Sequence, residues 1–207
     1  MEVIRKYFPD LNEKQITQFI HLDNLYMDWN TKINLISRKD IHGLYIRHIL
    51  HSLAIAKFIR FESETKILDV GTGGGFPGIP LAIFFPQAEF TLIDSIGKKV
   101  MVTKDIIEKT GLENCKSLQM RAENISEKYD FVCSRAVTAF PKFYSWIHNN
   151  ISNHNFNSVK NGIIYLKGGD LSKELNQFKH RVKTMNISDY FHEDYFKTKK
   201  IIYMPIT

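Results

Sequence analysis

Residues 69–78 have the composition in this chain that most suggests chemistry. They read Asp-Val-Gly-Thr-Gly-Gly-Gly-Phe-Pro-Gly and follow directly on the apolar pair Ile67-Leu68. Glycines at the carboxyl end of a buried strand let the chain turn sharply and let a ligand approach bare backbone. A helix that begins there presents unpaired N–H groups in its first turn. We therefore expect a ligand-binding loop at residues 69–78.

Asp94 is the expected partner of this loop. It ends the apolar run Phe90-Thr-Leu-Ile, 23 residues after Gly71. The carboxyl ends of neighbouring parallel strands meet at one edge of a sheet, where a carboxylate can accept hydrogen bonds from both hydroxyls of a ribose. The loop and this acid together predict a cofactor that contains adenosine.

Two adenosine cofactors remain open at this point. Gly73-x-Gly75-x-x-Gly78 matches the dinucleotide fingerprint GxGxxG, which is a weak signal by itself. Pro77 and Pro80 remove two N–H donors that a pyrophosphate would need, and Asp69 would repel its charge. The sulfonium and amine of S-adenosylmethionine are cationic and would be attracted by that acid. The pattern favours S-adenosylmethionine over NAD.

Strands and helices alternate along most of the chain. We expect strands at 67–70, 90–94, 116–120, 129–134 and 162–167, and further extended segments at 187–190 and 200–204. Helices are expected at 78–85, 97–109 and 171–181, and another follows the fourth strand and continues through Trp146. Short apolar runs that alternate with helices predict a doubly wound α/β sheet of the Rossmann-like kind. The aromatic residues of 140–146, Trp146 included, are expected to pack their helix, and the basic run 197–200 to form a solvated turn.

The first sixty residues have helical spacing only. Asn12 and Gln15 resemble a capping box at the start of a helix that continues to Trp29. A second helix is expected over residues 41–59. We therefore predict a small N-terminal helical extension at 1–62 and an α/β domain at 63–207.

Composition limits the classes of protein. The chain has 207 residues, 28 Lys and Arg against 22 Asp and Glu, and no apolar run as long as a membrane span. The excess of cations is compatible with a polyanionic partner. Cys115 and Cys133 are expected to be buried thiols, and His48 and His51 lack a third ligand for a metal. We expect a cytoplasmic, monomeric protein without a metal or a membrane.

Seven ordered motifs resemble those of a known family. They are Trp29-Asn-x-Lys-Ile-Asn-Leu35, Arg47-His-Ile-Leu-x-Ser52, Asp69-Val-Gly-Thr-Gly-Gly-Gly-Phe-Pro-Gly-Ile-Pro-Leu81, Leu92-Ile-Asp-Ser-x-x-Lys-Lys99, Arg121-Ala-Glu123, Ser134-Arg-Ala136 and Leu166-Lys-Gly168. This set resembles the bacterial 16S rRNA guanine-N7 methyltransferases, also called glucose-inhibited division protein B. It spans residues 29–168.

The resemblance implies both a fold and a site. The fold is that of class I S-adenosylmethionine-dependent methyltransferases, whose last strand is antiparallel, and the substrate is one guanine of 16S ribosomal RNA in the small subunit. Matching positions imply that Gly71, Phe76, Ala122, Glu123 and Arg135 contact the cofactor. Asp69, Gly73 and Asp94 join them on the arguments above. The family usually has Asp where this chain has His51, which leaves a substrate-facing role for that position open.

The implied chemistry needs few catalytic groups. Guanine N7 carries a lone pair and no proton, so in-line attack on a methyl group requires no general base. Arg47, His48 and Lys167 are the candidates for positioning the substrate. A methyltransferase that acts on a small molecule remains the alternative, because the charge excess is mild.

Overall fold

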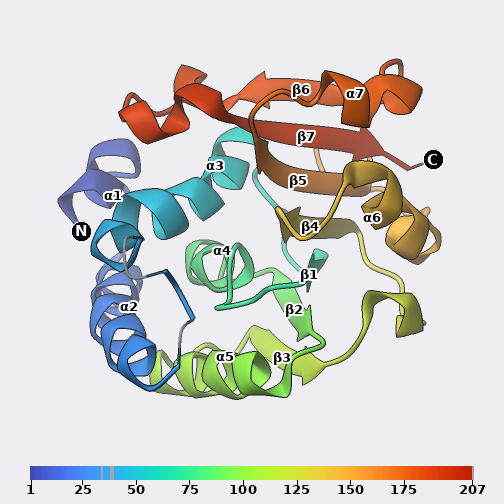
Figure 1. The fold of residues 1–207 in the computed structure, drawn as a ribbon. Coiled ribbons are helices and arrows are strands. Elements are labelled where there is room, and N and C mark those ends of the chain that lie inside the picture. The colour runs from blue at the N-terminus through green and yellow to red at the C-terminus, as the bar shows by residue number, and fades with distance from the viewer. Residues whose placement is uncertain (34, 38–39, 207) are drawn as a thin grey trace.

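A computed structural model describes residues 1–33, 35–37 and 40–206. Asn34, which belongs to the first motif, lies outside the described residues. The centre is a seven-stranded sheet with strand order β3-β2-β1-β4-β5-β7-β6 (Figure 1). The strands are β1 (Lys66–Val70), β2 (Glu89–Asp94), β3 (Cys115–Gln119), β4 (Phe131–Arg135), β5 (Gly162–Gly168), β6 (Lys183–Asn186) and β7 (Lys199–Pro205).

The pairing directions confirm the predicted class. Strands β1 to β5 pair in parallel, and β7 runs antiparallel to both β5 and β6. The parallel strands β1, β2, β4 and β5 are buried over most of their length because helices cover both sides of the sheet, whereas the edge strand β3 is largely exposed. This is the doubly wound sheet with an antiparallel last strand that the sequence predicts. The strand bounds differ from the expected ones by at most two residues.

The helices form a layer on each face of the sheet (Figure 1). They are α1 (Glu2–Tyr7), α2 (Glu13–Lys32), α3 (His51–Phe58), α4 (Gly78–Phe84), α5 (Gly97–Lys109), α6 (Phe140–Ile147) and α7 (Ser172–Leu175). Helices α1 to α5 bury their apolar residues in one cluster against the sheet. Helices α6 and α7 form a second cluster on the opposite face, centred on Phe140, Phe143 and Tyr165.

The N-terminal helices are part of the first cluster. The predicted capping box is confirmed, because the Asn12 side chain accepts from the Gln15 N–H at 2.9 Å and the Gln15 side chain accepts from the Asn12 N–H at 3.0 Å. The Gln15 amide also donates to the carbonyls of Ile83 and Phe84, which ties α2 to the end of α4. The helical extension at 1–62 stays a prediction as a domain, and it shares its core with the sheet.

The second expected helix is more complex than a single α-helix. Residues Ile41–Gly43 form a 3-10 turn, Leu44–Leu50 a π-helix, and only His51–Phe58 the α-helix α3. Apolar residues spaced by four fit a ladder with either i+4 or i+5 bonds, so periodicity does not separate the two. Wide π turns occur often at functional sites.

Two expectations for the C-terminal third are wrong. The helix expected at 171–181 is reduced to α7 and a 3-10 turn at Asn176–Phe178, because the chain must turn back to begin β6 at Lys183. The extended segment expected at 187–190 is a 3-10 turn, Ile187–Asp189, and the strand is the preceding segment, β6. An edge strand is mostly exposed, so β6 has no buried alternating pattern to reveal it.

None of the helices in the described ranges is long and apolar enough to cross a membrane.

Candidate cofactor and substrate site

The buried carboxylate of Asp69 holds the glycine loop in place. Its Oδ2 accepts hydrogen bonds from the Thr72 hydroxyl at 2.6 Å and from the Gly78 N–H at 2.9 Å. These bonds tie the end of β1 to the first residue of α4. A Cβ at Gly78 would lie 2.9 Å from that oxygen and 2.6 Å from Leu92, so only glycine permits the contact. The other oxygen, Oδ1, is buried and has no partner among the described residues.

Asp94 closes the loop from the neighbouring strand. Its Oδ2 accepts from the Gly73 N–H at 3.0 Å and its Oδ1 accepts from the Ile96 N–H at 2.9 Å. Lys99 lies 3.8 Å from Oδ2. Each carboxylate oxygen has a second lone pair, so Asp94 retains the capacity to accept two ligand hydroxyls. The predicted pairing between the glycine loop and this acid is confirmed in space.

A pocket of about 460 Å³ opens beside the loop and Asp94. It is lined by residues from the ends of β1, β2 and β4, from the segment after β3 and from α6, among them Gly71, Asp94, Ser95, Ile96, Ala122, Glu123, Arg135, Val137 and Trp146. Five predicted cofactor residues therefore meet in one pocket. Gly71 has φ +66°, and a Cβ there would lie 2.5 Å from Val137, so a side chain would close this wall. The acid and the bare backbone fit an adenosine-containing ligand.

Trp146 is a pocket residue that the sequence does not reveal. The expectation that it only packs α6 is incomplete, because the indole is partly exposed and lines the same pocket. Lys142, one helical turn earlier, holds its ammonium 5.4 Å from the indole ring. Spacing alone could not separate this flank of α6 from the buried one.

A second pocket, of about 310 Å³, adjoins the first and shares Arg135 and Ala136 with it. The three candidates for positioning the substrate, Arg47, His48 and Lys167, meet here. The remaining lining residues are Asp40, His51, Leu166, Gly168, Tyr195 and Lys199. The run 197–200, expected as a solvated turn, instead contributes Lys199, which starts β7, and the adjacent 3-10 helix contributes Tyr195.

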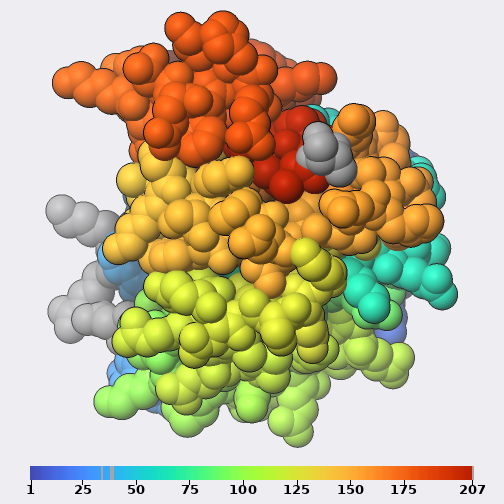
Figure 2. Space-filling model, turned by 90° about the vertical axis from the view of Figure 1, so that its right-hand side faces the viewer, coloured from blue at the N-terminus to red at the C-terminus, as the bar shows by residue number. Residues whose placement is uncertain are grey.

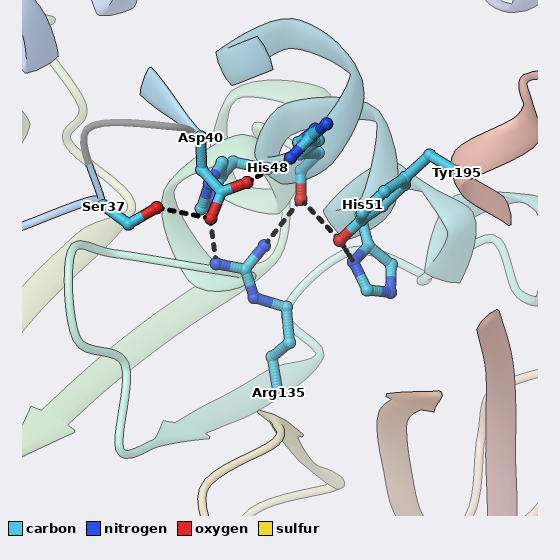
Figure 3. Close-up of polar contacts among 7 residues, drawn as sticks. Ser37, Asp40, His48, His51, Arg135 and Tyr195 are labelled. Atoms are coloured by element: carbon cyan, nitrogen blue, oxygen red, sulfur yellow. Dashed lines mark hydrogen bonds and ion pairs between the residues drawn. The ribbon is translucent and has the colours of Figure 1, made fainter. Parts of the chain in front are cut away.

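Arg135 is the wall between the two pockets. Its side chain points from the end of β4 to the π-helix, where it donates to the Arg47 carbonyl at 3.2 Å and to His48 Nδ1 at 2.9 Å (Figure 3). Its guanidinium also lies 5.0 Å from the ring of Phe76. Arginine cannot accept a hydrogen bond, so His48 Nδ1 is the acceptor and the proton of the neutral ring is on Nε2.

Both histidines of the second pocket are held neutral. Burial, and after it the charge of Arg135, lowers the pKa of His48 to about 3. The same causes lower the pKa of His51 well below its ordinary value. His51 is buried, its Nδ1 lies 3.3 Å from the Tyr195 hydroxyl, and its ring packs edge-on against Tyr195 and Phe196. His51 thus packs the wall of the pocket.

Arg47 is the exposed cation of this pocket. It forms an ion pair with Asp40, whose carboxylate also accepts from the Ser37 hydroxyl at 2.6 Å (Figure 3). These hydrogen bonds, with that of Ser37 the larger, lower the pKa of Asp40. Lys167 forms an ion pair with Glu174 of α7. Both cations therefore have acidic partners that an incoming phosphate could replace.

Asp69, Gly73 and Phe76 line neither pocket. Gly73 is joined to the first pocket through its bond to Asp94. Phe76 is buried and stacks on Tyr26 at 4.8 Å between ring centres, with His48 and Arg135 on it as well. Direct contacts of these three residues with the cofactor stay predictions. The contacts that they make within the structure hold the glycine loop in place and support the Arg135 side chain.

Replacing Asp69 with asparagine should reveal how much the ionisation of this buried acid lowers the free energy of unfolding. Burial raises the pKa of Asp69 from 3.8 to about 6, against the hydrogen bonds from Thr72 and Gly78, which lower it. A raised acid pKa favours the neutral form in the folded state. The stability that this group contributes is therefore complete below pH 3.8 and is lost as the pH rises through about 6. The loss is on the order of 3 kcal/mol.

The expected result is that Asp69→Asn gains stability relative to the parent protein between about pH 4 and about pH 7.5. Urea unfolding at the two pH values measures the difference in free energy, and Asp10→Asn, at an exposed carboxylate, is the matched control. An equal difference between variant and parent at both pH values would show that Asp69 ionises without a penalty. Cofactor affinity should fall in the same variant at the higher pH, because the negative charge is gone.

The thiols of the chain are buried, as predicted. Cys133 is fully buried in β4, and burial raises the pKa of its thiol well above the ordinary value. Burial likewise raises the pKa of the Cys115 thiol. Neither thiol is poised as a nucleophile. Within 1–33, 35–37 and 40–206, no group of three or more His, Cys, Asp and Glu side chains is arranged to hold a metal ion.

Comparisons with known proteins agree with this geometry. The family model described as rRNA small subunit methyltransferase G matches residues 15–202. Ribosomal RNA small subunit methyltransferase G of Flavobacterium psychrophilum is 56% identical over 206 residues, which cover 100% of this chain and 98% of the relative. The protein of the same name from Phocaeicola vulgatus is 52% identical over 207 residues, with coverage of 100% and 99%.

Solved structures share the fold at low identity. A SAM-dependent methyltransferase from Aquifex aeolicus has a TM-score of 0.60 at 16% identity and covers 83% of this chain and 100% of its own. A mutant of MtNAS in complex with S-adenosylmethionine has a TM-score of 0.58 at 11% identity, with coverage of 93% and 76%. The cofactor of this chain is S-adenosylmethionine. The match over most of its length and the identity above 50% show that the chain belongs to the rRNA small subunit methyltransferase G family.

Proposed function

We propose that this enzyme methylates N7 of one guanine in 16S ribosomal RNA. The observation that carries the proposal is the shared wall of the two pockets. One pocket holds the acid and backbone suited to an adenosine cofactor, the other gathers Arg47, Lys167 and Lys199, and Arg135 borders both. The names of the relatives supply the class of RNA, which is that of the small subunit.

The residues of the first pocket would hold the cofactor. Asp94 would accept the ribose hydroxyls, and Glu123 and Ala122, which follow β3, would lie beside the adenosine. The wall at Gly71 is bare backbone and lets the ligand approach closely. S-adenosylmethionine supplies an electrophilic methyl group on a sulfonium when it is bound. The chain's own residues have to bind the cofactor and the target nucleotide, orient them toward each other and exclude water.

The absence of a competent base at His48 favours a methyl acceptor that carries no proton. His48, with its pKa of about 3, is a weak base at neutral pH, and its Nδ1 is already engaged by Arg135. Both thiols are buried, which argues against the nucleophilic route that carbon methylation of a pyrimidine requires. Guanine N7 has a free lone pair and needs no base. Alignment of the two reacting groups can lower the activation free energy by up to ~7–11 kcal/mol.

The cations of the second pocket suit a nucleotide phosphate. Arg47 is exposed and paired with Asp40 at the surface, so a phosphate can replace the carboxylate at little cost. Lys199 lies over the ring of Tyr195, with its ammonium 4.8 Å from the ring centre. We propose that these groups position the target nucleotide, while the enzyme acts in the cytoplasm as a monomer without a metal.

Replacing Arg47 with alanine should impair the use of RNA and spare the cofactor. We expect KM for small-subunit RNA to rise about 5- to 20-fold, as for loss of one charge-assisted phosphate contact. The dissociation constant for S-adenosylmethionine, measured by calorimetry, should change less than about twofold. Arg60→Ala removes another exposed arginine, one that lines neither of the two pockets, and serves as the control. Equal loss of RNA and cofactor binding would instead assign Arg47 a structural role.

Incubation with labelled S-adenosylmethionine separates this function from its alternatives. Small-subunit RNA and a metabolite extract are offered in parallel, and the label is followed into each fraction. Label in the RNA supports the proposal. Label only in small molecules would make the enzyme a small-molecule methyltransferase, and tight cofactor binding without transfer would make the chain a binding module.

A further inference from the structure

The positive charge of the chain is concentrated in one stretch. Residues 140–185 contain seven Lys or Arg and two acidic residues, while the whole chain has a net charge of +6. This stretch includes α6, β5, α7 and the start of β6. One of its two acids, Glu174, is already paired with Lys167. The other, Asp170, is exposed.

Five of these cations form an exposed surface that we term the basic face. Figure 2 looks onto this side of the molecule, with the orange segment of α7 and β6 above the golden segment of α6. The basic face consists of Lys142 on α6, Lys173 on α7, Lys179 and Arg181 in the turn that follows, and Lys183 at the start of β6. None of the five takes part in an ion pair of the described residues.

Aromatic side chains lie between the cations of the basic face. The Arg181 guanidinium lies 5.6 Å from the ring of Tyr144, and the Lys142 ammonium lies 5.4 Å from the indole of Trp146. Residues 144 and 146 project on different flanks of α6, because each residue turns a helix by about 100°. Trp146 also lines the cofactor pocket. The basic face therefore begins at the mouth of that pocket and crosses α6 to β6.

The helices on the opposite side of the sheet differ in charge arrangement. On α2, Lys32 pairs with Asp28 at 2.7 Å, and on α5, Lys109 pairs with Asp105 at 2.9 Å. These two lysines are each neutralised by an acid one helical turn away. Unpaired lysines and arginines interleaved with partly exposed aromatic rings are the arrangement that single-stranded or looped RNA requires.

We propose that the basic face binds the sugar–phosphate backbone of the rRNA segment that flanks the target nucleotide. The inference rests on the proposed function, because it takes the substrate to be RNA. It adds that the RNA reaches the pocket across the basic face. Phosphates would contact Lys179, Arg181 and Lys183 and release their counterions. The partly exposed indole of Trp146 offers a ring on which an unstacked base can lie.

The triple variant Lys179→Ala/Arg181→Ala/Lys183→Ala tests this surface. We expect KM for small-subunit RNA to rise at least about tenfold at ~150 mM monovalent salt. The slope of log KM against log salt should fall by about 2–3, because each phosphate contact contributes about 0.7–0.9 to it. The effect should lie in KM rather than kcat, and the affinity for S-adenosylmethionine should stay within about twofold of the parent.

Two matched variants control for charge and for folding. Lys14→Ala/Lys104→Ala/Lys116→Ala removes three exposed cations from α2, α5 and β3, and it should leave the salt slope unchanged. Lys179→Arg/Arg181→Lys/Lys183→Arg keeps the charge and should keep the parent KM. Equal KM values and equal salt slopes for the two triple-alanine variants would overturn the proposal that the basic face binds RNA. Absence of RNA methylation by the parent protein would instead overturn the proposed function.

Discussion

Replacing Arg135 with alanine should lower kcat/KM for RNA methylation by about 200- to 4000-fold. Arg135 lines both pockets with a partly buried charge and donates hydrogen bonds to the Arg47 carbonyl and to His48. A hydrogen bond from a charged group contributes about 1.5–3 kcal/mol, and the expected fall corresponds to about 3–5 kcal/mol for the loss of both bonds. The cavity left over Phe76 would also release the π-helix from β4. Steady-state kinetics with stripped small-subunit RNA measure the loss.

Two further variants serve as controls for Arg135→Ala. Arg135→Lys keeps the charge but cannot donate to two acceptors at once from a planar group, so an intermediate loss is expected. Arg47→Ala removes the neighbouring side chain and leaves the carbonyl that Arg135 binds. A fall of less than about tenfold in Arg135→Ala, with an unchanged melting temperature, would mean that the wall between the pockets is not needed for turnover.

Replacing Asp94 with alanine should weaken S-adenosylmethionine binding at least about 100-fold. The carboxylate accepts from Gly73 and Ile96, and each hydrogen bond to a charged group contributes about 1.5–3 kcal/mol. Its loss frees the glycine loop and removes the proposed acceptor of the ribose hydroxyls. A hundredfold change in the dissociation constant corresponds to about 2.7 kcal/mol. Calorimetric titration of the cofactor measures it.

The controls for Asp94 lie on the same strand. Asp94→Asn keeps one acceptor oxygen and should lose less affinity than alanine. Glu89→Ala removes an exposed acid from the opposite end of β2 and should bind the cofactor like the parent protein. Unchanged affinity in Asp94→Ala would remove this residue from the cofactor site.

Local signals in the sequence are sufficient for the frame of the fold. Three of these signals depend only on residues that are close in sequence. They are the glycine loop, the acid at the end of β2 and the capping box at Asn12. Buried parallel strands are apolar runs of about five residues, which stand out against amphipathic helices. The structure therefore has the predicted alternation and the predicted meeting of Asp94 with the loop.

What the sequence could not predict depends on contacts between distant segments. Tyr195 and Lys199 join the second pocket only because β7 inserts antiparallel beside β5. Trp146 has the spacing of a packing residue and becomes a pocket residue because one flank of α6 faces the segment after β3. The strand β6 is polar and exposed at the sheet edge, so no periodic pattern reveals it.

Identification of the methylated nucleoside tests the central proposal most directly. Stripped small-subunit RNA is methylated with labelled S-adenosylmethionine, digested to nucleosides and analysed by mass spectrometry, with Arg135→Ala as the low-activity control. We expect the label in 7-methylguanosine, at one position of the 16S RNA. Label in any other nucleoside, such as an N1- or N2-methylguanosine, or in no nucleoside at all, would contradict N7 methylation by this enzyme.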